Sequence, residues 1–161
     1  MKMPRKIHQI WVGPNPIPSR EADLIEKTKL YDWQHTLWRT TPWDYPPTLA
    51  AEYDKRFVEG RYVWCADMLR VWAVYDRGGM YLDVDFEILD ESILNQLTKH
   101  EGFVCVHSNA EDLTVVNGAF GFSERHPLLK HCVDRINESN WWYGPSWFGV
   151  TIRDAFGLKP D

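Results

Sequence analysis

The chain has 161 residues and a formal net charge of −5, with 44% hydrophobic and 25% charged residues. This length and this balance are typical of one folded domain, residues 1–161, and exclude general disorder. The excess of negative charge disfavours a protein that binds nucleic acid phosphates non-specifically. A phosphate-bearing ligand would therefore need local basic groups or a metal.

Three features bear on the cellular compartment. No run approaches the roughly 18 apolar residues that a membrane-spanning helix needs, so no transmembrane segment is expected. No long apolar stretch follows the basic residues 1–6, so no signal peptide is expected either. The cysteines Cys65, Cys105 and Cys132 are odd in number and far apart, which favours free thiols. These features predict a cytoplasmic protein.

The first part of the chain predicts two strands and two helices. Residues 7–12 are rich in strand-forming side chains and stop at Gly13, which indicates a strand followed by a loop. Ser19 is expected to cap the helix that follows it. A second strand is expected over residues 37–43 and a short helix over residues 48–57.

The strongest predicted helix covers residues 62–75, which contain no glycine or proline and lead to Gly78 and Gly79. Residues 80–89 then alternate between apolar and polar like a strand. Further strands are expected over residues 103–106 and 113–122, and further helices over residues 128–136 and 147–156. Alternating strands and helices predict an α/β fold, whose ligands bind at the carboxyl ends of the strands.

Asp83 and Asp85 are the first candidates for chemistry. They lie two residues apart on a predicted strand, so both carboxylates would point to one face. Two carboxylates held this close repel each other unless a cation bridges them. Mg²⁺ or Mn²⁺ takes one or two protein carboxylates and completes its shell with water and substrate phosphates. The alternative is a solvated edge strand whose polar face carries these aspartates and Glu87.

Asp67 and Arg70 form a second candidate pair. They lie at positions i and i+3 of the strongest helix, on the stripe that also carries Val63 and Val74. Charged groups on such a stripe should be paired or employed in function, because burying an isolated charge is costly. A helix salt bridge is one interpretation. In the other, Asp67 accepts hydrogen bonds from sugar hydroxyls and Arg70 binds sugar or phosphate.

Trp11 ends the first predicted strand in a chain with an aromatic content of 14% and nine tryptophans. Large aromatic side chains supply much of the buried area of a small domain, so one interpretation places Trp11 in the core. The functional alternative is a platform on which a nucleobase stacks at the carboxyl end of the strand. Composition alone does not separate these two uses.

Three blocks of the sequence together resemble one enzyme family. They cover residues 7–13, 66–70 and 78–85, and residues 117–120, 125–128 and 144–145 match more loosely. In order, residue type and spacing they are similar to the DXD-containing sugar transferases. This family includes fungal mannosyltransferases, galactosyltransferases, capsular polysaccharide glycosyltransferases and, more distantly, the glucosylating bacterial toxins.

The resemblance implies a GT-A fold, which is a Rossmann-like nucleotide-diphospho-sugar transferase fold, in a minimal single domain. It implies a retaining transfer of a hexose to a glycan or another hydroxyl acceptor. The donor would be a nucleotide-sugar, with a UDP-sugar favoured and GDP-mannose as the other candidate. The cofactor would be Mn²⁺ or Mg²⁺.

The resemblance also implies roles for individual residues. Trp11 would stack on the base, while Asp67 and Arg70 would hold the donor sugar and the ribose. Asp83 would contact the sugar or ribose and the metal, and Asp85 would bind the metal most directly. Candidates for the remaining contacts are Asn117 at the reacting sugar and Ser146 and Trp147 near the C-terminal end of the chain. Packing of Trp147 in a helix against the core is the favoured alternative for that residue.

Two other classes of protein remain in view. In a phosphohydrolase, Asp83 would be the nucleophile and Asp85 the general acid, but Glu87 stands where that class carries threonine or valine. A non-catalytic carbohydrate-binding module would account for the tryptophans, yet it gives no reason for the four charged residues of the two candidate pairs. The transferase interpretation accounts for both features.

Overall fold

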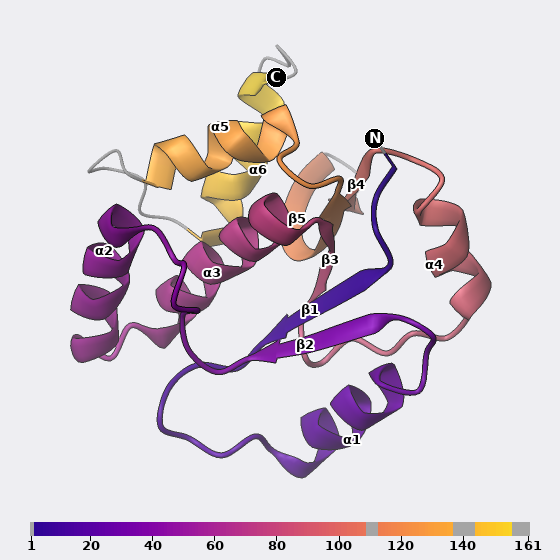
Figure 1. Ribbon diagram of the computed structural model, residues 1–161, viewed down its shortest axis with the longest axis horizontal. Helices are drawn as coiled ribbons and strands as arrows, with labels where there is room; N and C mark the ends of the chain where they lie inside the picture. Colours follow the sequence, from indigo (N-terminus) through magenta and orange to yellow (C-terminus); the bar gives the residue numbers. More distant parts are fainter. Residues whose placement is uncertain (1, 109–112, 137–143, 156–161) are drawn as a thin grey trace.

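A mixed β-sheet with the strand order β2-β1-β3-β5-β4 forms the centre of the fold (Figure 1). The computed structural model describes residues 2–108, 113–136 and 144–155. β1 pairs in parallel with β2 and β3, whereas β5 runs antiparallel to both β3 and β4. The strands are β1 (Lys6–Ile10), β2 (Gln34–Trp38), β3 (Gly79–Leu82), β4 (Gly102–Ser108) and β5 (Leu113–Phe122).

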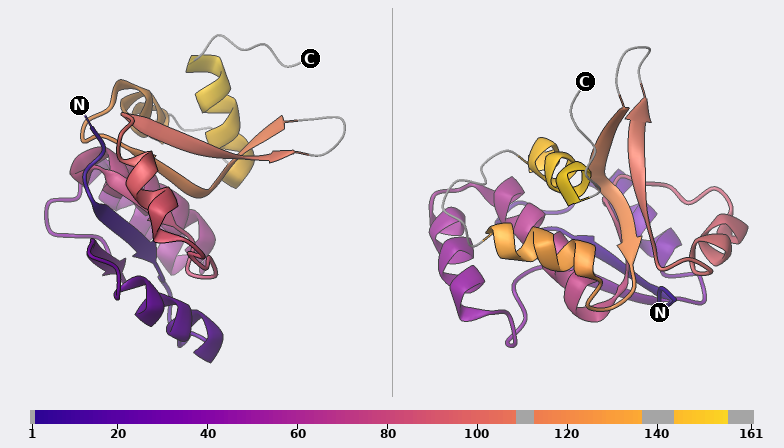
Figure 2. Two further views of the ribbon diagram at one scale, coloured as in Figure 1. Left: turned by 90° about the vertical axis from the view of Figure 1, so that its right-hand side faces the viewer. Right: turned by 90° about the horizontal axis from the view of Figure 1, so that it is seen from above.

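Helices cover both faces of this sheet. α3, α5 and α6 lie on one face and α4 lies on the other (Figure 2). α1 lies next to β2 at the edge of the sheet (Figure 1). Within the described ranges, no helix is both long and apolar enough to cross a membrane. The helices are α1 (Ser19–Thr28), α2 (Pro47–Val58), α3 (Tyr62–Arg77), α4 (Glu91–Leu97), α5 (Pro127–Ile136) and α6 (Gly144–Ala155).

The strand period divides the core into two parts. Successive residues of a strand point to opposite faces, so Met80 packs on the side of α4 while Tyr81 packs on the side of α3. The larger part lies under α3 and contains Phe120 of β5 and Phe148 of α6, whose rings are 4.8 Å apart. α3 is therefore fixed against the sheet by a well-packed aromatic layer.

The glycine pair after α3 has two functions in the fold. Gly78 ends the helix with a φ of 62°, a left-handed conformation that favours glycine. At Gly79, a Cβ atom would lie 2.5 Å from the backbone oxygen of Lys6. Any larger residue there would separate β3 from β1, so the helix stop also allows the close approach of the two central strands.

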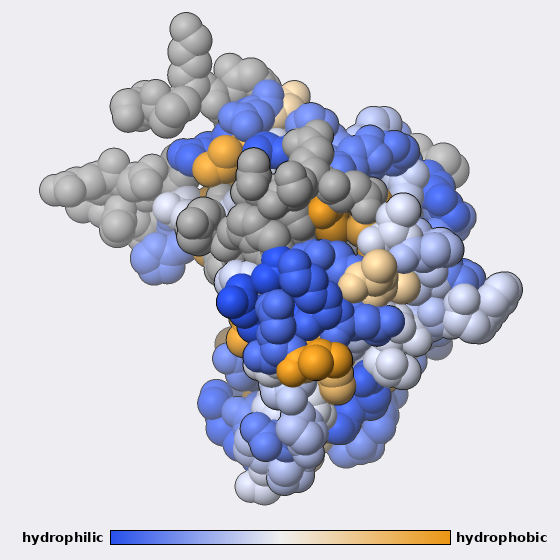
Figure 3. Space-filling model, turned by 90° about the vertical axis from the view of Figure 1, so that its left-hand side faces the viewer, coloured by the Kyte–Doolittle hydropathy of each residue, from blue (hydrophilic) through white to orange (hydrophobic). Residues whose placement is uncertain are grey.

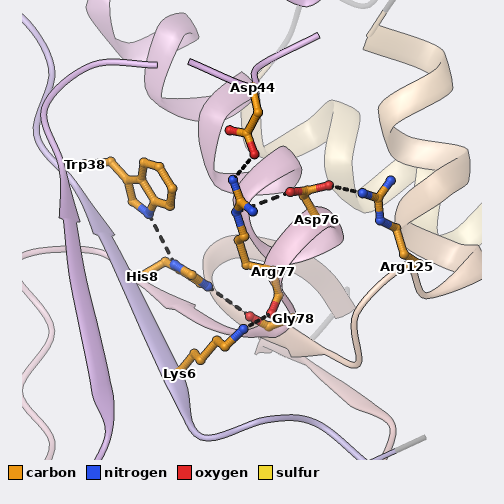
Figure 4. A network of polar contacts seen from close by, with 8 residues as sticks. All are labelled: Lys6, His8, Trp38, Asp44, Asp76, Arg77, Gly78 and Arg125. Carbon is orange, nitrogen blue, oxygen red and sulfur yellow. Dashed lines mark hydrogen bonds and ion pairs between the residues drawn. The ribbon is translucent and has the colours of Figure 1, made fainter. Parts of the chain in front are cut away.

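A polar network fixes this end of α3 to β1 and β2 (Figure 4). His8 is buried, with Nε2 2.9 Å from the carbonyl oxygen of Gly78, and its Nδ1 accepts a hydrogen bond from Trp38 Nε1 at 3.2 Å. Burial lowers the pKa of His8 to about 4, so the imidazole is neutral at pH 7. Lys6 Nζ donates to the carbonyl of Arg77 at 2.8 Å. The network therefore joins the C-terminal end of α3 to Lys6 and His8 of β1 and to Trp38 of β2.

The predicted α/β class is confirmed, and most predicted helices are present with shifted ends. The strand expected over residues 80–89 is wrong beyond Leu82, because the chain turns there, and α4 was not expected. The strand expected over residues 37–43 instead covers Gln34–Trp38. Ser19 is the first residue of α1 and not its cap, which is Pro18 with no side-chain cap bond.

Candidate active site

A cleft of about 430 Å³ opens at the carboxyl ends of β1 and β3. This is the edge where parallel strands of α/β folds bind their ligands. Four segments supply the walls: the end of β1, the start of α1, the first turns of α3 and the end of β3. The lining residues are Ile10, Trp11, Val12, Pro18, Glu21, Tyr62, Val63, Ala66, Arg70, Tyr81, Asp83, Val84 and Asp85.

Asp83 and Asp85 reach this cleft from a turn and not from a strand. β3 ends at Leu82, and the N–H of Phe86 donates to the Asp83 carbonyl at 3.1 Å, which closes a turn over residues 83–86. The expectation that both aspartates lie on one strand face is therefore wrong. Both nevertheless line the cleft, where the side chain of Asp83 is 34% exposed and Asp85 is exposed.

The Asp83 carboxylate is held by two neighbours. Tyr81 donates its hydroxyl to Asp83 Oδ1 at 2.5 Å, and Arg70 Nη1 lies 3.3 Å from the same oxygen. Burial raises the pKa of Tyr81 well above its ordinary value, so the phenol keeps its proton and stays a donor. The Arg70 guanidinium also lies over the Tyr81 ring, 4.5 Å from its centroid. These contacts fix the first carboxylate of the turn.

Asp67 and Asn117 lie behind Arg70, outside the cleft lining. Asp67 Oδ1 accepts a hydrogen bond from Asn117 Nδ2 at 2.9 Å and lies 3.4 Å from Arg70 Nη2. Arg70 Nη1 also donates to the Asn117 carbonyl at 3.0 Å. Asp67 Oδ2 is buried, and within the described residues it has no hydrogen-bond partner. Burial raises the pKa of Asp67, while Arg70 and Asn117 oppose the rise.

The salt bridge between Asp67 and Arg70 therefore exists, but it is one part of a larger set. Three parts of the fold bring the set together: α3 carries Asp67 and Arg70, β3 and the turn after it carry Tyr81 and Asp83, and β5 carries Asn117. The contacts join residues up to 50 positions apart in the chain. The arrangement places one guanidinium against a carboxylate at the floor of the cleft.

Trp11 lies in the wall of the cleft and is only partly buried. Its Nε1 donates to the Asn15 carbonyl at 2.9 Å, which restrains the indole ring. On the same side, Tyr62 packs closely over Gly13, where a Cβ atom would lie 2.9 Å from the ring. Trp11 therefore lies in the wall of the cleft and not in the core, and its stacking on a base stays a prediction.

The two remaining candidates do not join the cleft lining. Trp147 is 7% exposed and packs in the core next to Phe148 and Ile152. Ser146 belongs to the first turn of α6, and its side chain lies outside the described residues. Of the residues proposed from the sequence, the cleft therefore brings together Trp11, Arg70, Asp83 and Asp85, with Asp67 and Asn117 directly behind.

The carboxylate oxygens at the cleft suit a small divalent cation. Mg²⁺ and Mn²⁺ prefer oxygen ligands, and Mg²⁺ in particular needs only one or two protein carboxylates when substrate phosphates supply the rest. No cluster of three or more His, Cys, Asp or Glu side chains with metal-binding geometry occurs within the described residues. Asp83 and Asp85 are the two carboxylates of the lining that would hold such a cation, with a phosphate ligand completing its shell.

Sequence reasoning missed three residues of this site. Tyr81 could have been found, because it lies two residues before Asp83 and the strand pattern places both on one side. Gly118 had no such signal, although a Cβ atom there would lie 2.8 Å from Asp83 Oδ2. Glu21 lines the cleft from α1, and nothing in its local sequence marks it.

Comparisons with known proteins find structures with a similar fold. No protein-family model matches the sequence, and no curated protein matches it. Among solved structures, a glycosyltransferase described as PaToxG aligns with a TM-score of 0.71 and 17% identity, covering 97% of this chain and 71% of its own. This chain therefore shares its fold with a solved glycosyltransferase.

Two further solved structures, both described only as transferases, agree with this relationship. One is a cysteine-to-serine double mutant that aligns with a TM-score of 0.60 and 13% identity, covering 99% of this chain and 87% of that chain. The other has a TM-score of 0.56 and 11% identity, covering 97% of this chain and 86% of that chain. At such identities the similarity concerns the fold, and function has to be argued from the site.

Proposed function

We propose that this protein is a metal-dependent glycosyltransferase that moves a hexose from a nucleotide-sugar to a hydroxyl group of a glycan or another acceptor. A UDP-sugar is the favoured donor and GDP-mannose is the second candidate. One observation carries the proposal: in a fold shared with glycosyltransferases, Asp83 and Asp85 line the cleft beside Arg70 and Trp11. From the resemblance of the sequence to the DXD sugar transferases, we further propose that the transfer retains the anomeric configuration. The anomeric proton signal of the product, observed by NMR, tests this stereochemical outcome.

The charge of the cleft supports the need for a metal. The carboxylates of Glu21, Asp83 and Asp85 line it, while Arg70 supplies the single guanidinium of the lining described here. A diphosphate would meet net repulsion in such a cleft. A cation between the two aspartates and the diphosphate would remove this repulsion and stabilise the charge that develops on the leaving group.

The protein side chains would divide the donor among them. Asp83 and Asp85 would hold the cation, with the Asp83 carboxylate kept in place by Tyr81 and Arg70. Trp11 would stack on the base at the other side of the cleft. Asp67, held by Asn117, would orient the Arg70 guanidinium toward the donor.

A carbohydrate-binding module is less consistent with the surface. Among the tryptophans that the structure describes, which do not include Trp141 and Trp142, Trp43 alone belongs to the exposed large hydrophobic residues, at 95% exposure, so the described tryptophans form no exposed row. The side of the molecule on which α2 lies is mainly hydrophilic, with small separate hydrophobic areas (Figure 3).

The test is a panel of nucleotide-sugars incubated with the protein and Mn²⁺, with release of the nucleoside diphosphate as the readout. Without an acceptor, water is expected to replace the missing hydroxyl, so one donor should be hydrolysed slowly. A chelator should abolish this hydrolysis. Faster cleavage of simple phosphomonoesters than of any nucleotide-sugar would instead identify a phosphohydrolase.

A further inference from the structure

Gln9 is a polar side chain in an unexpected place. It lies on the central strand β1 and is 0% exposed. A buried amide is costly unless it is hydrogen-bonded, and a purely structural position on a central strand normally carries an aliphatic residue. The amide of Gln9 has two contacts: Oε1 lies 2.9 Å from His35 Nε2, and Nε2 lies 3.5 Å from the carbonyl oxygen of Asp83.

These two contacts orient the amide. Gln9 Oε1 is an acceptor, so His35 must donate from Nε2. The amide nitrogen, which is a donor, then faces the Asp83 carbonyl, which is an acceptor. His35 on β2 therefore determines which end of the Gln9 side chain meets the turn.

The contact between Gln9 and the Asp83 carbonyl lies just beyond the end of the backbone pairing between β1 and β3. β1 and β3 pair only at Ile7 with Met80 and at His8 with Tyr81. Beyond these two pairs the N–H of Asp83 donates to Gly118 of β5 at 2.8 Å, and Asp83 has no residue paired with it on β1. The Gln9 side chain meets the Asp83 carbonyl, which also closes the turn by accepting from Phe86.

We propose that Gln9 and His35 are positioning residues that hold the turn of Asp83 and Asp85 in its metal-binding shape. This inference rests on the proposed function, because it concerns the cation that the two aspartates would bind. A cation shared by two carboxylates needs both at a fixed separation, and supporting hydrogen bonds behind metal ligands commonly supply that rigidity. Gln9 acts on the backbone of the turn, whereas Tyr81 and Arg70 act on the Asp83 side chain.

The experiment measures Mn²⁺ binding in the presence of saturating UDP by electron paramagnetic resonance of the free ion, and repeats it with GDP. Gln9→Met keeps the length of the side chain but removes both polar contacts. We expect it to weaken Mn²⁺ binding about 2- to 10-fold, the range for one net hydrogen bond. UDP binding without metal should not change.

His35 supplies the graded pair of variants. His35→Leu removes the donor to Gln9 and should weaken Mn²⁺ binding in the same direction. His35→Gln places an amide N–H where the imidazole Nε2 lies and should restore binding to nearly the wild-type level. His35 is only partly buried, so both variants should fold even if Gln9→Met does not.

His8→Leu is the matched control. His8 is the preceding residue of β1, is equally buried and has two polar contacts, but its side chain points to the opposite face, toward Gly78 and Trp38. It should lower the melting temperature and leave Mn²⁺ binding unchanged. Wild-type Mn²⁺ affinity in Gln9→Met and His35→Leu, or an equal loss in His8→Leu, would overturn the positioning role alone. Absence of Mn²⁺ binding by the wild type with either nucleotide would overturn the proposed function as well.

Discussion

Replacing Tyr81 by phenylalanine removes one hydroxyl and leaves the rest of the site in place. The ring remains under the Arg70 guanidinium and next to Phe120, whose centroid is 5.7 Å away. The lost interaction is the hydrogen bond to Asp83 Oδ1. Hydrogen bonds to charged groups contribute about 1.5–3 kcal/mol, and the lower end applies because water reaches the partly exposed Asp83 side chain. For a domain of this size, about 1.5 kcal/mol corresponds to a melting temperature lower by about 3–6 °C.

Thermal melting of the metal-free protein measures this loss, and Tyr53→Phe is the matched control. The Tyr53 hydroxyl is also buried, but among the described residues it has no hydrogen-bond partner. Removing it should leave stability unchanged or raise it slightly, because an unpaired buried hydroxyl is unfavourable. A double-mutant cycle of Tyr81→Phe with Asp83→Asn should show a coupling energy of at least about 0.5 kcal/mol. Equal melting changes in the two tyrosine variants, or an additive cycle, would refute the contact.

Further expectations concern the metal, the base and pH. Asp85→Asn should lower turnover by about 10²-fold or more while leaving the metal-free protein as stable as before, and a normal rate at saturating Mn²⁺ would remove Asp85 from the metal site. Trp11→Ala should weaken nucleotide binding by about 1–3 kcal/mol with little change in melting temperature, whereas a collapsed melting temperature would mean that Trp11 is structural. Mn²⁺ and the matching nucleoside diphosphate together should raise the melting temperature by more than the sum of their separate effects, because each completes the site of the other; additive shifts would argue against a shared site. The pKa of His8 is lowered from 6.5 to about 4, so between pH 6.5 and pH 4 the imidazole binds a proton in the unfolded chain but not in the folded chain. Stability should therefore fall as pH drops from 6.5 toward 4, by up to about 3 kcal/mol from this residue, and urea unfolding should show a smaller fall in His8→Leu.

Local patterns predicted the elements whose stability is local. The helix expected over residues 62–75 appears as Tyr62–Arg77, because an uninterrupted run of helix-compatible residues ends at Gly78. The strand expected over residues 113–122 is present with the same ends. The alternating pattern over residues 80–89 misled because alternation cannot show where the partner strand stops. The turn at Asp83 depends on hydrogen bonds to Gly118 and Phe86, and the first of these is a tertiary contact.

The site was predictable as a set of residue types but not as a set of contacts. Asp67, Arg70, Asp83 and Asp85 stood out by charge on apolar segments. The contact of Asp67 with Asn117, by contrast, depends on β5 lying beside β3, an order that no local pattern determines. For Trp147 the core alternative is confirmed, because its side chain packs with Phe148 and Ile152 and does not line the cleft.

The strand order also determines when this site can come into existence during synthesis. β1 is made first, but one of its two neighbours is β3, and β3 in turn needs β5, which ends at Phe122. At a synthesis rate of about 5–20 residues per second, β5 is completed on the order of ten seconds after β1. A nascent chain stopped before β5 leaves β3 as an unpaired edge next to two newly made aspartates. The cation binding proposed for Asp83 and Asp85 would therefore depend on the completed sheet and would not guide the early steps of folding.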